Sequence, residues 1–438
     1  MKEYYPQIKK IAFEGPQSRN PMAFHYYDAE AEVLGKKMKD WMRYAMAWWH
    51  TLGQASADPF GGQTRHYEWD NAADPMQRAK DKADAGFEIM QKLGIGFFCF
   101  HDVDLIEDSD DIAEYEDRMA QITTYIRGKM NETGIRCLWG TANVFGHERY
   151  TNGAATNPDF DVVARAAVQI KNALDATMAL GGENYVFWGG REGYYTLLNT
   201  QMQREKDHLA RMLTAARDYA RGKGFKGTFL IEPKPMEPTK HQYDVDTETV
   251  IGFLRANGLD KDFKINIEVN HATLAGHTFQ HELAVAVDNG MLGSIDANRG
   301  DPQNGWDTDQ FPINDTSMTS AMLQVIRNGG FGTGGTNFDA KLRRSSINPE
   351  DIFIAHISGM DTLAHALLNA AAIATESPIP EMVKARYASF DSGMGKAFEQ
   401  GKMSLEDLVD YAKKRGEPAR TSGSQELYET LFNIYSSR

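Results

Sequence analysis

Residues 263–271, FKINIEVNH, contain a strand-like apolar run that ends in a glutamate and is followed three residues later by a histidine. Side chains alternate across a strand, so Asn266 and Glu268 lie on one face while Ile265 and Ile267 lie on the other. The apolar side chains then face a layer of helices, and the polar ones lie near the carboxyl end of the opposite face. This pattern indicates a parallel strand with a polar site at its end.

Short apolar runs recur along the chain and alternate with helical patterns. A parallel strand must be reached by a crossover over one face of the sheet, so the alternation indicates parallel pairing. Eight such units close most naturally into a (β/α)8 TIM barrel. The predicted strands are Arg43–Trp49, Phe97–His101, Arg136–Gly140, Tyr185–Trp188, Gly227–Glu232, Phe263–Glu268, Gly293–Asp296 and Gly335–Asp339. The predicted helices include Pro75–Leu93 (with Asp74 as its cap), Asp159–Leu180, Gln203–Lys223 and Asp315–Arg327.

An open, doubly wound sheet is the structural alternative. In an open sheet, acids from four neighbouring strands would spread along an edge, whereas in a barrel they converge on one pocket. A single site built from acids of four strands therefore requires the barrel more than the open sheet. Three further strand ends carry polar residues on a shared face, namely Glu232 with Lys234, Asp296 with Ser294 and Asn298, and Asp339 with Asn337.

The barrel is expected to span residues 41–377, preceded by an extension over residues 1–40. Residues 378–438 contain helical patterns without strands and are expected to form a C-terminal helical arm for subunit contacts. The last helix is predicted at Ser424–Tyr435, with Ser422 or Ser424 as its cap.

Composition excludes several classes of protein. The net charge of −14 argues against a nucleic-acid or anionic-membrane partner. Cys99 and Cys137 lie inside apolar runs and are interpreted as buried thiols rather than a disulfide or zinc pair. The amino terminus lacks a signal-peptide pattern, and the longest apolar stretch, residues 364–374, is too short to span a bilayer. A soluble, cytoplasmic protein is expected.

The second half of the chain concentrates carboxylates at predicted strand ends. One pair of like charges about 4 Å apart costs roughly 4 kcal/mol at an effective dielectric constant near 20, so such a cluster requires protons or cations. Oxygen-rich ligands with a single histidine favour Mg²⁺ or Mn²⁺. Two divalent cations and Lys234 nearly balance six carboxylates, and Glu268 is the expected bridging ligand. The proposed metal ligands are Glu232, Glu268, His271, Asp296, Asp307, Asp309 and Asp339.

Two further groups are expected at the same rim of the barrel. His101 is followed by acids in FHDVD, an arrangement that holds an imidazole for proton transfer, although a buried structural histidine is the alternative. Trp49, Trp139, Phe145 and Trp188 are either barrel core or apolar faces for a sugar.

Two other stretches are not assigned to the site. GFGTGG, residues 330–335, fits a dinucleotide-binding motif but follows a helix and precedes a strand, which is the reverse of the required order. The acidic stretch Glu107–Asp117 is interpreted as the solvated start of a helix.

Six motifs together resemble xylose isomerase, in its class with a long N-terminal extension. They are FHDVD (100–104), WGTANVFGH (139–147), IEPKPMEP (231–238), NIEVNHATLAGH (266–277), SIDANRGDPQNGWDTDQFP (294–312) and NFDAKLRR (337–344). The resemblance implies a homotetramer that interconverts D-xylose and D-xylulose, and also D-glucose and D-fructose, with two divalent ions per subunit (Mg²⁺, Mn²⁺ or Co²⁺).

The resemblance also implies individual roles. One ion would take Glu232, Glu268, Asp296 and Asp339, and the other Glu268, His271, Asp307 and Asp309. His101, oriented by Asp104, would open the sugar ring, and Lys234 would bind the oxygen beside the carbonyl. Phe60, in the stretch DPFG (58–61), would reach a neighbouring subunit's pocket. Trp49, Trp139, Thr141, Phe145 and Trp188 would complete the substrate site.

A hydride shift between C2 and C1 is the expected chemistry, because the acids are committed to metals. A base-catalysed enediol route ranks second. A metal-dependent phosphodiesterase or endonuclease would need more histidines and a basic groove. A non-catalytic sugar-binding protein would need neither the second metal nor the pair of His101 and Asp104.

Overall fold

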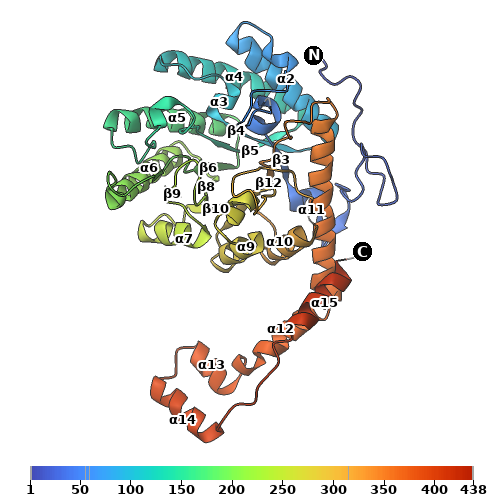
Figure 1. Ribbon diagram of the computed structural model, residues 1–438, viewed down its shortest axis with the longest axis vertical. Coiled ribbons are helices and arrows are strands. Elements are labelled where there is room, and N and C mark those ends of the chain that lie inside the picture. Colours follow the sequence, from blue (N-terminus) through green and yellow to red (C-terminus); the bar gives the residue numbers. More distant parts are fainter. Residues whose placement is uncertain (1, 55, 59, 314, 437–438) are drawn as a thin grey trace. The chain divides into compact units, whose positions relative to one another are not determined.

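A closed barrel of parallel strands forms the core of residues 1–365 in the computed structural model, which describes residues 2–54, 56–58, 60–313 and 315–436. Its strands run in chain order around the barrel, and β12 closes it by pairing with β3 (Thr336 opposite Tyr44). Figure 1 shows helices of the alternating units around the outside of the strands. The predicted TIM barrel is therefore confirmed. The barrel strands are β3 (Tyr44–Ala47), β4 (Phe97–His101), β5 (Arg136–Thr141), β6 (Asn184–Trp188), β8 (Thr228–Glu232), β10 (Phe263–Glu268), β11 (Leu292–Asp296) and β12 (Thr336–Phe338).

The bounds of β4 and β10 agree with the prediction, but the first and last strands are shorter than expected. Trp49 does not lie on β3, because Trp48 adopts helical dihedral angles (φ −63°, ψ −43°) and the chain enters a π-helical turn, Trp49–Gly53. The chain leaves the barrel wall at Trp48, whose ring packs against Phe87 and Phe98. Asp339 likewise follows the end of β12 instead of lying within it.

The helices that follow the strands supply the outer layer. Asp74 caps α2 by accepting from the Gln77 backbone N–H at 2.8 Å, with Pro75 in the first turn as predicted. The acidic stretch Glu107–Asp117 is helical only in its second half, because Asp111 caps a helix that begins at Ile112. The helices are α2 (Pro75–Leu93), α3 (Asp102–Leu105), α4 (Ile112–Thr133), α5 (Phe160–Ala179), α6 (Met202–Gly222), α7 (Thr247–Ala256), α8 (Val269–Leu274), α9 (Phe279–Asp288), α10 (Asp315–Arg327) and α11 (Asp351–Glu376).

The glycine-rich stretch 330–335 connects α10 to β12, as its position in the sequence indicated. Gly330 and Gly332 have φ angles of +102° and +63°. A Cβ on Gly334 would lie 1.8 Å from the carbonyl oxygen of Gly293 on β11. Gly330 and Gly332 therefore supply left-handed backbone, and Gly334 permits a close backbone approach in the barrel wall.

The N-terminal extension contains little regular structure. It forms the antiparallel pair β1 (Glu32–Val33) and β2 (Lys36–Lys37), followed by α1 (Met38–Met42). The Asp361 carboxylate accepts from the backbone N–H groups of His25, Tyr26 and Tyr27 and thereby holds this segment in place. Another antiparallel pair, β7 (Gly193–Tyr194) and β9 (His241–Gln242), joins two loops beyond the barrel strands.

The chain divides into two compact units, residues 1–365 and 366–438, and the division falls inside α11. The second unit continues with α12 (Ile379–Tyr387), α13 (Gly393–Glu399), α14 (Leu405–Arg415) and α15 (Gln425–Tyr435). None of the residues in these four helices is buried. Ser424 stands at the cap position of α15, but its side chain makes no capping bond because its backbone is left-handed (φ 51°). The predicted cap position at Ser424 is therefore confirmed, but its side chain does not supply the expected hydrogen bond.

Both cysteines are buried and unbonded to one another, as expected. In the part of the chain that the structure describes, no helix is both long enough and apolar enough to cross a bilayer.

Candidate metal and substrate site

Four predicted acids converge because each stands at the carboxyl end of a neighbouring barrel strand. Glu232 ends β8, Glu268 ends β10, Asp296 ends β11, and Asp339 follows β12. One carboxylate oxygen of each lies within 4.8 Å of the others. Glu232, Glu268 and Asp296 are at most 4 % exposed, so these charges lie away from solvent.

A second group forms beside the first. Oxygens of Glu268, Asp307 and Asp309 also lie within 4.8 Å of one another. His271 Nε2 lies 3.0 Å from Glu268 Oε2 and 3.3 Å from Asp307 Oδ2. The structure thus brings together all seven predicted ligands, and Glu268 belongs to both sets.

The loop after β11 carries Asp307 and Asp309 back over the barrel mouth. Arg299 and Gln310 exchange backbone hydrogen bonds across the loop, which folds it onto itself. Asp309 has a φ angle of 43°, and its backbone carbonyl accepts from the Lys341 N–H. These contacts fix the turn that aims both aspartates inward.

Burial and mutual repulsion raise the pKa values of Glu232, Glu268 and Asp296 well above their ordinary range. Burial acts in the same direction on Asp307 and Asp339, but Lys234 and His50 respectively outweigh it and lower the pKa of each. The protein alone therefore compensates only part of the cluster. The negative charge that remains on the cluster favours the binding of divalent cations.

The donor set fits such ions. Oδ2 of Asp296 is buried and has no hydrogen-bond partner among the described residues. Several carboxylates and one imidazole match the preference of Mg²⁺ and Mn²⁺ for oxygen ligands. Besides Lys234, which the sequence placed among the acids, the structure adds Lys341 and His50.

Lys234 donates to Asp307 at 2.6 Å, and its ammonium lies 5.3 Å from the ring centre of Trp188. Lys341 donates to Asp309 at 2.6 Å. His50 Nε2 lies 2.6 Å from Asp339 Oδ1. Sequence reasoning missed His50 and Lys341, although Lys341 stands two residues after Asp339 and His50 directly follows Trp49.

Buried amides orient the carboxylates. Asn266 donates to Glu232 at 3.0 Å, and Asn337 donates to Asp296 at 2.9 Å. Asn298 donates both to Glu268 at 2.7 Å and to the Asp339 carbonyl at 2.9 Å. Strand alternation had placed these asparagines on the same face as the acids. Hydrogen bonds of this kind hold metal-ligating side chains in position.

Aromatic rings continue the site away from the acids. Trp49 packs edge-on against His101, with ring centres 4.6 Å apart, and lies 5.6 Å from Trp139. Phe145 lies 5.6 Å from His101 and 4.4 Å from Trp188. The Trp49 indole N–H donates to Asp339 at 3.0 Å, so the aromatic wall and the acid cluster adjoin.

His101 Nδ1 lies 3.0 Å from Asp104 Oδ2, the pairing expected from FHDVD. Asp102 has a separate environment, because it is buried and accepts from Tyr115 at 2.5 Å, Gln169 at 2.8 Å and the Asn143 backbone N–H at 2.7 Å. Thr141 is buried opposite His101 in the barrel register.

Phe60 lies apart from the acids within this chain. Its side chain is 80 % exposed and its ring centre lies 5.8 Å from that of Trp306. Pro59, in the same predicted loop, lies outside the described residues.

Comparison with known proteins gives consistent results over the whole chain. A family model described as "Xylose isomerase-like TIM barrel" matches residues 87–343, and one described as "XylA2 C-terminal domain" matches residues 383–436. The chain is 71 % identical over 434 residues to a xylose isomerase of Bacteroides thetaiotaomicron, covering 99 % of each chain. It is 59 % identical over 437 residues to xylose isomerase 2 of Xanthomonas campestris pv. campestris, covering 100 % of this chain and 98 % of the relative.

Among solved structures, D-psicose 3-epimerase from Clostridium cellulolyticum H10 aligns with a TM-score of 0.50 and 10 % identity, over 74 % of this chain and 99 % of that chain. That likeness concerns the fold alone. The family model covers more than half of this chain, and the identities extend over nearly its full length. The chain belongs to the xylose isomerase family.

Proposed function

We propose that this enzyme interconverts D-xylose and D-xylulose, and also D-glucose and D-fructose, by ring opening and a 1,2-hydride shift. The proposal rests on how Glu268 and Trp49 connect the acid groups to the aromatic wall. Glu268 belongs to both acid groups, while Trp49 connects Asp339 to the aromatic wall beside His101. A polar, charge-rich floor thus meets an apolar wall, which suits a sugar with hydroxyl groups and C–H faces.

Two divalent ions fit the acid groups. Glu232, Glu268, Asp296 and Asp339 would hold one ion, and Glu268, His271, Asp307 and Asp309 the other. When bound, the ions supply Lewis-acid polarisation of the C1 carbonyl and the C2 hydroxyl. Mg²⁺, Mn²⁺ and Co²⁺ are the proposed candidates.

His101 is the proposed group for ring opening. Asp104 holds Nδ1 at 3.0 Å, which leaves Nε2 for proton exchange with the ring oxygen or the anomeric hydroxyl. Trp49 and Phe145 pack edge-on against the imidazole and limit its rotation. Lys234 would bind the sugar oxygen beside the carbonyl and stabilise the negative charge that develops there.

In the shift itself, the hydrogen on C2 moves to C1 with its electron pair, and a proton passes from the C2 oxygen to the C1 oxygen. Trp139, Trp188 and Phe145 keep this region poor in water. The competing enediol route needs a carboxylate beside C2 that is not a metal ligand. Each of the six predicted metal-binding carboxylates belongs to an acid group, and Asp104 is paired with His101 at 3.0 Å, so the hydride route is proposed.

We further propose that the enzyme is a homotetramer in which Phe60 enters a neighbour's pocket. Phe60 is 80 % exposed, so its ring is accessible to a neighbouring subunit. In the second unit, Val383, Phe398 and Leu405 are also exposed. A C-terminal arm that packs on another subunit would cover these side chains.

The direct test of the activity is xylulose formation from xylose with and without Mg²⁺, using enzyme first treated with EDTA. We expect formation only with the ion restored. Xylose deuterated at C2 then separates the two routes, since the shift retains the label in the product. Loss of deuterium to solvent would establish the enediol route instead.

A further inference from the structure

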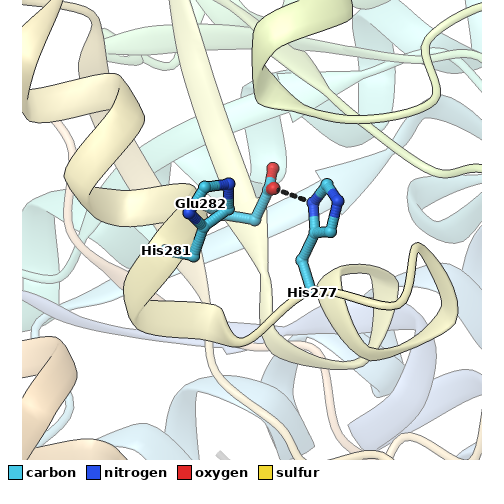
Figure 2. A group of neighbouring side chains, drawn as sticks. All are labelled: His277, His281 and Glu282. Carbon is cyan, nitrogen blue, oxygen red and sulfur yellow. Dashed lines mark hydrogen bonds and ion pairs between the residues drawn. The ribbon is translucent and has the colours of Figure 1, made fainter.

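A second cluster of metal-ligating side chains lies outside the catalytic acid groups. It consists of His277, His281 and Glu282, each of which places one ligand-type atom within 4.8 Å of the others. In the view of Figure 2 the Glu282 carboxylate lies between the two imidazole rings. The ring centres are 5.0 Å apart. We propose that these three residues form a peripheral binding site for a divalent transition metal such as Zn²⁺, Ni²⁺, Co²⁺ or Cu²⁺.

Glu282 is the fixed member of the cluster. It is 3 % exposed, and one carboxylate oxygen accepts from the Thr247 backbone N–H at 2.8 Å. The other oxygen lies 2.5 Å from His277 Nδ1. The carboxylate is therefore held by the start of α7 and turns its remaining oxygen toward the histidines.

The two histidines reach this oxygen from different segments. His277 belongs to the connection between α8 and α9, and its side chain is 32 % exposed. His281 is an exposed residue in the first turn of α9. Tetrahedral zinc at about 2.0–2.2 Å from each ligand separates ligand atoms by about 3.3 Å, so modest side-chain rotation closes the cluster around an ion.

Ligand chemistry distinguishes this site from the catalytic one. Two imidazoles and one carboxylate suit Zn²⁺ and its neighbours, and this His₂Glu set occurs in zinc enzymes, where water completes the coordination. Mg²⁺ prefers oxygen ligands and competes poorly here. The amino terminus of α9 disfavours a cation, and the negative charge of Glu282 offsets that effect.

An ion at this position would join the connection after α8 to α9. Helix α8 carries His271, and Glu282 and His271 line the same small cavity. Binding would therefore stabilise the segment that carries the proposed metal ligand His271. This role is independent of the sugar chemistry, and its test does not depend on turnover.

The test uses the full-length enzyme with Mg²⁺ in large excess to fill the catalytic groups. Zn²⁺ is then titrated into wild type, His281→Gln and a matched control, His66→Gln, which alters another exposed histidine. Equilibrium dialysis with metal analysis gives the number of zinc ions per chain. We expect one fewer zinc ion in His281→Gln than in wild type and His66→Gln.

Crystals soaked in Zn²⁺ locate the ion by anomalous scattering at the zinc edge. We expect a peak among His277, His281 and Glu282 in wild type, and its loss in His281→Gln while any peaks at the catalytic groups remain. Equal zinc content in wild type and His281→Gln, or no peak among the three residues in wild type, would overturn the proposal. The cluster would then be a hydrogen-bonded pair of His277 and Glu282 with His281 beside it.

Discussion

His50 Nε2 lies 2.6 Å from Asp339 Oδ1 and 3.4 Å from Asp309 Oδ2, so a buried imidazole connects two proposed metal ligands. Burial by itself would lower the pKa of His50. The neighbouring carboxylates outweigh it through their charges and hydrogen bonds, and they raise the pKa to about 9. In the absence of metal the imidazole is therefore cationic at neutral pH and neutralises part of the acid cluster.

Replacement of His50 by leucine should destabilise the metal-free protein more than the metal-loaded protein. Breaking a buried ion pair costs about 3–5 kcal/mol when the partner remains charged. Thermal unfolding in EDTA and in excess Mg²⁺ measures both states, and a bound dication should replace part of the lost positive charge. His66→Leu, which removes an exposed imidazole, is the control. A loss of equal size in EDTA and in Mg²⁺ would show that His50 contributes only packing.

Glu268→Gln should weaken both metal sites, because Glu268 belongs to both acid groups. Asp296→Asn is the matched comparison, since Asp296 belongs only to the group with Glu232 and Asp339. Calorimetric titration with Mn²⁺ should show two weakened sites in the first variant and one in the second. Two undisturbed sites in Glu268→Gln would rule out a bridging role.

His101→Asn should slow turnover most when the substrate is the cyclic sugar. An amide cannot exchange a proton as an imidazole does, but it preserves much of the polarity at this position. Initial rates on cyclic xylose and on sugar presented in the open-chain form separate ring opening from isomerisation. Equal slowing on both forms would remove ring opening from the role of His101.

Phe60→Ala should leave the fold of the single chain intact and lower kcat/KM, because the side chain is 80 % exposed yet is proposed to enter a neighbouring site. Phe160→Ala is the control, at 78 % exposure on the first turn of α5. Steady-state kinetics together with thermal unfolding test both variants. Unchanged kcat/KM in Phe60→Ala would contradict the shared pocket.

His356 provides a pH prediction at a residue that is not a proposed metal ligand. It is buried against Phe311 and Phe338, and burial lowers its pKa to about 4. The pKa in the unfolded chain is about 6.5, so between these values the unfolded state binds more protons and the folded state loses stability as pH falls. One such group contributes up to about 3 kcal/mol.

The free energy of unfolding of wild type should therefore fall more steeply between pH 6.5 and pH 4 than that of His356→Leu. Denaturant unfolding at a series of pH values measures the difference, and the acid groups common to both proteins cancel. Parallel curves for the two proteins would show that His356 is already protonated in the fold or exposed to solvent.

Much of the fold could be predicted because its signals are local. The bounds of β4, β10, α2 and α10 agree with the sequence pattern, since alternation, helical periodicity and the Asp74 cap depend on neighbouring residues. The same alternation placed Glu232, Glu268 and Asp296 on one face. The first strand ends earlier than its local pattern predicts, at Trp48, where the ring packs against Phe87 and Phe98. The Ser424 side chain forms no capping bond, and its backbone is left-handed.

The contacts within the site could not be predicted in this way. His50 and Asp339, or Asn298 and the Asp339 carbonyl, are far apart in the chain and meet only because β12 pairs with β3 and β11 to close the barrel. A residue pattern records which side chains face the barrel axis, because that follows from backbone geometry. Which of them touch depends on strand register, loop paths and burial, and these are set by the packing of the whole chain.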